Sequence, residues 1–183
     1  MERDFVEAAK RGDREAFGLL AGGAIDRLHG IARLILRDTV GAEDAVQEAL
    51  TQAWRDLPSL RDPERFDAWL YRLLVRSCAD EGRKRRRFEA NVRILSAEPS
   101  THDQSGAIAD RDQLERGLAR LTVDQRSVLV LRFHLDLTLE QIAEALGLPL
   151  GTVKSRLHYA LEALRIAVEA DAALPGASKG LSA

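Results

Sequence analysis

The stretch "TLEQIAEALGLPLGTVKSRLHYALEAL", residues 138–164, predicts a helix, a tight turn and a second helix. Thr138 and Gln141 have the spacing by which a hydroxyl and an amide cap a helix start. Gly147 can adopt the positive φ that ends a helix, and Pro149 suits the first turn of the next one. The preceding segment, residues 118–137, predicts one or two supporting helices. Their expected core residues are Leu118, Leu121, Val128, Leu129 and Leu131.

The second of these helices has an apolar and a polar side. The apolar stripe at helical spacing consists of Val153, Leu157, Ala160, Leu161 and Leu164. The outward set consists of Gly151, Thr152, Ser155, His158 and Tyr159. In a helix-turn-helix the second helix enters the major groove, and its early outward residues meet base edges. Lys154 and Arg156 lie on the flanks, where they can reach phosphates or guanine acceptors. The pattern favours DNA binding over the alternative, an αα-hairpin with a merely solvated polar face.

Composition predicts an all-α globular protein. The chain has 183 residues, of which 45% are hydrophobic and 5% aromatic, with long stretches of Ala, Leu, Arg and Glu. The single Cys78 excludes a disulfide within the chain, and the charged start "MERDFVEAAKRGD" lacks the apolar run of a signal peptide. We therefore expect a cytoplasmic protein. The apolar stretches are too short for direct membrane insertion.

A change in composition divides the chain into two small helical domains. Residues 96–112 are rich in Ser, Asp, Glu, Gly and Pro and have no amphipathic period, which is typical of a linker. The predicted parts are an N-terminal helical domain at 1–94, a flexible linker at 95–112, a helix-turn-helix domain at 113–170 and a flexible tail at 171–183.

In the first domain, "GAEDAVQEALTQAWRDL" predicts a helix from about Ala42. Its inward residues are Ala45, Val46, Ala49, Leu50, Ala53 and Leu57. Its exposed residues are Asp44, Gln47, Glu48 and Gln52. Such an acidic, amide-rich face is either ordinary solubility or a docking surface for a basic partner.

The next helical segment, "FDAWLYRLLVRSCADEGRKRRR", combines aromatic and cationic residues. Phe66, Trp69 and Tyr71 precede a run of five cations, Arg83–Arg87, in a chain whose net charge is only −2. Single-stranded DNA is bound by rings that stack on bases and by charges that hold the backbone. The alternatives are a solvated helix end for the basic run and a core position for the aromatics, to which we assign Phe66.

Together, "EDAVQEALTQAW", "FDAWLYRLL" and the stretch at 138–164, in this order and with this linker, resemble bacterial RNA polymerase sigma factors of the small extracytoplasmic-function group. The resemblance covers nearly the whole chain. It implies a sigma factor that binds core RNA polymerase and promoter DNA and directs transcription initiation. It also implies a partner that inhibits in trans, an anti-sigma protein. Two features depart from the family: Gly22 and Gly23 predict a short or bent helix, and the turn "SLRDPER" lacks an aromatic residue.

Roles for individual residues follow from this resemblance. The residues implied to dock on the largest polymerase subunit are Asp44, Gln47 and Glu48. Those implied to hold the minus-ten element are Leu60, Arg61, Asp62, Trp69, Arg76, Arg83, Lys84 and Arg85. Those implied to contact the minus-thirty-five element are Thr152, Lys154, Ser155, Arg156 and His158.

Other function classes fit the sequence less well. The four histidines have no metal-ligand spacing, Cys78 has no evident activating partner, and no glycine-rich phosphate loop is present, so we expect no enzyme, cofactor or metal. A helix-turn-helix regulator that acts without core polymerase is the main alternative, but it leaves the first domain unexplained. A third possibility is an interaction protein that uses the acidic helix.

Overall fold

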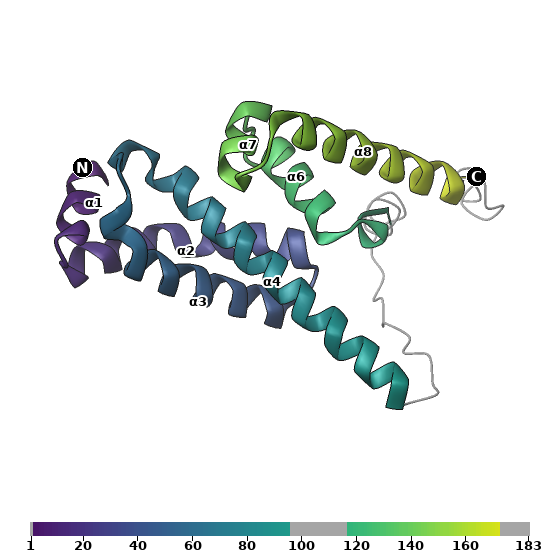
Figure 1. Cartoon of the computed structure of the whole chain (residues 1–183), viewed down its shortest axis with the longest axis horizontal. Helices are drawn as coiled ribbons and strands as arrows, with labels where there is room; N and C mark the ends of the chain where they lie inside the picture. Colours follow the sequence, from purple (N-terminus) through teal and green to yellow (C-terminus); the bar gives the residue numbers. More distant parts are fainter. Residues whose placement is uncertain (1, 96–116, 173–183) are drawn as a thin grey trace, which may run out of the picture.

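The computed structural model describes residues 2–95 and 117–172, and within them all regular structure is helical (Figure 1). The α-helices are α1 (Glu2–Lys10), α2 (Arg14–Leu36), α3 (Thr39–Asp56), α4 (Phe66–Leu95), α6 (Val123–Phe133), α7 (Leu139–Leu146) and α8 (Leu150–Ala172). Two 3₁₀ turns, η1 (Leu57–Ser59) and η2 (Pro63–Arg65), connect α3 to α4. The predicted all-α class is confirmed. Most of the predicted linker and tail lies outside the described residues, so the three boundaries between the four predicted parts remain predictions.

Local signals define the ends of α2 and α3. The Asp13 carboxylate caps α2 by accepting the backbone N–H groups of Glu15 at 2.9 Å and Ala16 at 3.0 Å. The helix then continues for 23 residues through Gly22 and Gly23, so the expectation of a short helix there is wrong. Asp38 caps α3 through the N–H of Gly41 at 3.1 Å, which starts this helix at Thr39 rather than near Ala42.

The N-terminal core forms where α4 crosses α2 and α3 (Figure 1). Five of the six predicted inward residues of α3 and its end are buried, and Leu50 is half-buried. Phe66 is buried, as predicted, and so is Tyr71. The apolar side chains of α4 that complete this core are Leu70, Leu73, Leu74, Val75 and Cys78. Within the described residues, no helix combines the length and apolar character required to cross a membrane.

The helix-turn-helix has the predicted form with two corrections. Thr138 and Gln141 form a reciprocal capping box, and Gly147 has φ 64°. Helix α8 begins at Leu150, so Pro149 precedes its first turn instead of lying within it. Leu161 is 41% exposed and is not part of the core. The other four residues of the predicted apolar stripe are buried or half-buried.

The supporting helix α6 matches its prediction. A second capping box, between Thr122 and Gln125, begins it. Of the five core residues predicted for the segment 118–137, four are buried and Leu118, which precedes α6, is half-buried.

The two halves of the chain pack against each other. Helix α6 contacts α2 and α4, and α7 contacts α4, so the helix-turn-helix lies on the N-terminal helices (Figure 1). Ile142 and Val153 belong to the same buried cluster as the N-terminal core. The Arg126 guanidinium extends from α6 to the Ile35 carbonyl of α2, and an ion pair joins Arg65 of η2 to Glu144 of α7. The structure therefore shows the two halves in one closed arrangement.

Candidate nucleic-acid and docking surfaces

The first candidate surface lies on the N-terminal half of α8. Lys154, Ser155 and His158 are exposed, and Thr152 is half-buried. The Ser155 hydroxyl donates to the Thr152 carbonyl at 3.0 Å, while the rings of His158 and Tyr159 lie 5.6 Å apart. This surface, which we call the α8 polar face, presents side chains that can donate to and accept from base edges.

Arg156 is positioned differently from the rest of that helix face. It is half-buried, and its Nη2 lies 3.4 Å from Oδ2 of Asp124 on α6. A partly exposed ion pair of this kind contributes little to stability. Breaking the pair therefore costs little, which leaves the Arg156 guanidinium available to another acceptor.

The second candidate surface is the acidic face of α3, formed by Asp44, Gln47 and Glu48. All three are exposed, and Glu48 accepts a hydrogen bond from Gln52 at 2.6 Å. The face continues toward α4: the hydrogen bond from Lys84 to Glu81 raises the pKa of Lys84, and Asp44 and Glu48 add to the effect. Lys84 thus lies within electrostatic reach of the acidic face of α3.

An apolar groove that the sequence analysis missed adjoins Gln47. It has a volume of about 580 Å³ between α2 and α3. Its apolar lining residues are Phe17, Ile25, Val46, Leu50 and Trp54. The rings of Phe17 and Trp54 lie 5.1 Å apart. Half-exposed aromatic side chains beside polar ones are typical of protein interfaces. Trp54 at the end of "EDAVQEALTQAW" is the sequence feature that could have indicated this groove. Its contact with Phe17, however, depends on how α2 and α3 pack.

The turn between α3 and α4 corrects one predicted role. Leu60 is only 7% exposed and packs in the core, so its side chain is not available to contact a base. Arg61 and Asp62 are exposed, and Asp62 accepts the N–H of Glu64 at 3.0 Å. The surface of this turn is therefore polar.

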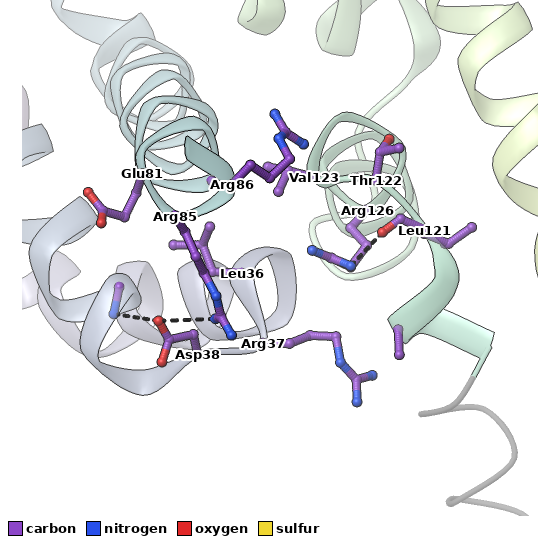
Figure 2. A pocket seen from close by; sticks show the side chains of 13 residues that line it. Leu36, Arg37, Asp38, Glu81, Arg85, Arg86, Leu121, Thr122, Val123 and Arg126 are labelled. Atoms are coloured by element: carbon purple, nitrogen blue, oxygen red, sulfur yellow. Dashed lines mark hydrogen bonds and ion pairs between the residues drawn. The ribbon is translucent and has the colours of Figure 1, made fainter. Parts of the chain in front are cut away.

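The cationic residues of α4 divide between two sides of the helix. Arg76 and Arg83 are exposed, seven residues apart and hence on one stripe, and Arg83 pairs with Asp80. Trp69, seven residues before Arg76, is half-buried with its ring 6.0 Å from that of Phe66. Arg85 instead turns inward to Asp38, with its Nη1 3.4 Å from Oδ2 (Figure 2). The structure therefore separates Arg85 from the outer stripe.

Within the described parts of the chain, no three His, Cys, Asp or Glu side chains are grouped so that they could hold a metal ion. Cys78 is buried, and burial raises the pKa of its thiol to about 12.

Comparison with known proteins identifies the class of protein that these surfaces belong to. The family described as Sigma-70 region 2 matches residues 24–88, and Sigma-70, region 4 matches residues 117–165. The RNA polymerase sigma-H factor of Pseudomonas aeruginosa is 31% identical, covering 92% of this chain and 94% of that protein. The ECF RNA polymerase sigma factor SigL of Mycobacterium tuberculosis is 37% identical, covering 72% and 77%.

Solved structures agree with this assignment. CnrH in complex with the cytosolic domain of CnrY matches with a TM-score of 0.65 and 26% identity, covering 93% of this chain and 98% of that one. The sigma factor RpoE in complex with the anti-sigma factor NepR from Bartonella quintana matches with a TM-score of 0.62 and 27% identity, covering 84% and 94%. The chain belongs to the extracytoplasmic-function (ECF) RNA polymerase sigma factors. It is a DNA-binding protein of transcription initiation that acts with core RNA polymerase.

Proposed function

We propose that three surfaces of this chain carry the separate binding functions of a sigma factor. The acidic face of α3 and the adjoining apolar groove dock on core RNA polymerase. The outer stripe of α4, with Arg76 and Arg83, and the polar turn at Arg61 and Asp62 hold the opened minus-ten element. The α8 polar face contacts the minus-thirty-five element as duplex DNA.

The observation that carries this proposal is the exposed acidic face of α3 beside an apolar groove. A helix-turn-helix regulator that binds duplex DNA alone has no use for this surface, whereas a sigma factor must dock on polymerase. The protein acts by binding and positioning, without catalysis, in the cytoplasm where polymerase and promoter DNA are found. RpoE of Bartonella quintana was solved with an anti-sigma factor. By this likeness, we propose that an inhibitory protein also binds this chain.

The deciding experiment reverses the charge of the α3 face. Asp44→Lys/Glu48→Lys should weaken binding to core polymerase by roughly 10- to 100-fold, because interfacial charge reversals commonly cost a few kcal/mol. Binding is measured by fluorescence anisotropy with the full chain. The matched control is Glu140→Lys/Glu169→Lys, which changes the net charge equally at exposed positions of α7 and α8.

The control should bind polymerase like the unchanged chain. Equal affinities of the two double variants for polymerase would remove the α3 face from the interface. Binding of duplex promoter DNA by the helix-turn-helix should be unchanged in Asp44→Lys/Glu48→Lys, because both positions lie on α3, outside the helix-turn-helix.

A further inference from the structure

The closed arrangement forms a half-open cationic cavity between the two halves of the chain (Figure 2). Its volume is about 490 Å³, and its walls come from the end of α2, the start of α3, the C-terminal part of α4 and the start of α6. Four arginines line it: Arg37, Arg85, Arg86 and Arg126. Two carboxylates, Asp38 and Glu81, also line it, so positive charges outnumber negative ones by two.

Both carboxylates already have partners. Asp38 accepts the N–H of Gly41 and pairs with Arg85, and Glu81 accepts a hydrogen bond from Lys84 at 2.9 Å. Arg86 is exposed and forms no ion pair with any residue that the structure describes. Asp38 therefore balances Arg85, whereas Glu81 is paired with Lys84, which does not line the cavity.

Arg126 shows the electrostatic cost of this lining. It is only 8% exposed and donates to the carbonyls of Leu118 at 3.1 Å, Leu121 at 2.6 Å and Ile35. Burial, and to a lesser degree repulsion from the other three arginines, lowers the pKa of Arg126 to about 10. A buried guanidinium held among like charges is stabilised when an anion lies nearby.

Two helix N-termini add to the positive potential. Asp38 and Gly41 at the start of α3 line the cavity, as do Thr122 and Val123 at the start of α6. Each helix start carries a partial positive charge from its aligned peptide dipoles. The Asp38 carboxylate and the Thr122–Gln125 capping box already occupy these two helix ends, so the arginines supply most of the positive charge available to an anion.

We propose that this cavity binds a small phosphate-rich anion of nucleotide size. Its volume lies within the roughly 300–1,000 Å³ of typical small-molecule sites. Arginine side chains match phosphate oxygens through two parallel hydrogen bonds, and the exposed Arg86 at the edge of the lining can provide them after a change of rotamer. Because the walls come from both halves, an anion bound there also favours the closed arrangement. This inference does not depend on the roles proposed for α3, α4 and α8.

Inorganic tripolyphosphate is the probe, titrated into the full chain by calorimetry at near-physiological salt. Arg86→Gln should weaken its binding at least about tenfold, since it removes charge-assisted hydrogen bonds. The matched control is Arg87→Gln, an exposed neighbour outside the lining that removes the same charge. It should change the affinity by less than about threefold, as expected for a screened surface charge. Arg37→Asn is a second variant, because Arg37 has φ 57° and asparagine tolerates that backbone.

Three outcomes would overturn the proposal. One is an equal loss of affinity in Arg86→Gln and Arg87→Gln, which would show general attraction to the basic run. Another is the absence of tripolyphosphate binding at millimolar concentration. The third is Arg86-dependent binding of a short non-promoter duplex that tripolyphosphate does not displace, which would make this a contact for the DNA backbone.

Discussion

Lys154 is the residue of α8 whose substitution best distinguishes a contact with a DNA base from a contact with a DNA phosphate. It is exposed, and within the described residues no carboxylate pairs with it, whereas Arg156 is paired with Asp124. We expect Lys154→Ala to weaken transcription from all promoters alike and to lower the salt dependence of binding by about one unit of slope, as a phosphate contact should. Transcription across a promoter library at two salt concentrations measures both.

Relaxed preference at a single promoter position in Lys154→Ala would show a base contact instead. Arg165→Ala is the control, because this arginine lies two turns or more beyond the polar face and pairs with Glu162 and Glu169. Activity of Lys154→Ala equal to that of the control would exclude Lys154 from the DNA interface.

We expect the Cys78 thiol to be unreactive in the native state. The thiolate is the reactive form, and burial raises the pKa of Cys78 from 9.0 to about 12. An aromatic disulfide reagent at pH 8 should therefore modify the native chain only as fast as it unfolds. A cysteine introduced at the exposed Glu140 should react at once, and rapid reaction of the native chain without it would contradict the buried placement.

The raised pKa of the Cys78 thiol also makes the stability of the fold fall as the pH rises. Below pH 9 the thiol is protonated in both states, so its effect on folding is constant. Between about pH 9 and 12 the unfolded chain loses a proton that the folded chain keeps, and stability falls by up to about 1.4 kcal/mol per pH unit. Urea unfolding of the native chain and of Cys78→Ala across this range isolates the effect, because the alanine variant lacks it.

At the scale of helices, the features that the sequence predicted correctly are those determined by neighbouring residues, such as helix caps and helix ends. Thr138 with Gln141 and the positive φ of Gly147 depend on residues within one turn, so both features could be predicted. The burial of Leu60 and the inward turn of Arg85 depend on elements distant in the chain. The same holds for the groove formed by Phe17 and Trp54. Periodicity identifies an apolar stripe but not how far a neighbouring helix covers it, which is why Leu161 was assigned wrongly.

The contact between α4 and α6 depends on a glycine. A Cβ added at Gly82 would lie 2.8 Å from Cγ2 of Val123, whereas one added at Gly30 on α2 meets nothing within 4 Å. Gly30→Ala should raise the free energy of unfolding by about 0.5–1 kcal/mol through helix propensity. Gly82→Ala should lower it by about 1–3 kcal/mol through overpacking against a stiff β-branched side chain.

Urea unfolding of the two glycine variants tests this contact directly. If Gly82→Ala were as stabilising as Gly30→Ala, α6 would not pack against α4 in solution. In that case the cavity between the halves would also lose one of its walls.

For the whole molecule, the sequence predicted two helical units but not how they pack. A composition change is a local signal, whereas the contact of Arg126 with Ile35 joins residues 91 positions apart. Besides the apolar packing of α6 and α7 on the N-terminal helices, the contacts between the halves include Arg126 with Ile35, Gly82 beside Val123, and the Arg65–Glu144 ion pair. The first two are buried, while both partners of the third are about half exposed.

This difference in burial predicts which contact controls the closed arrangement. An exposed ion pair typically contributes about 0–1 kcal/mol, whereas leaving buried carbonyls without their donor costs about 1–3 kcal/mol. Arg126→Lys keeps the positive charge but removes the planar guanidinium that donates to the carbonyls of Ile35, Leu118 and Leu121. It should shift the chain toward separated halves, and Arg65→Ala should shift it little.

Single-molecule energy transfer between dyes on Arg14→Cys and Glu140→Cys follows this opening, because both positions are exposed and the native Cys78 is buried. Lower transfer efficiency in Arg126→Lys, with Arg65→Ala unchanged, is the expected result. Equal shifts in both variants would mean that the surface pair contributes as much as the buried one. If core polymerase requires the halves to separate, its addition to the unchanged chain should produce the same low-transfer state, and Arg126→Lys should reach that state at lower polymerase concentration.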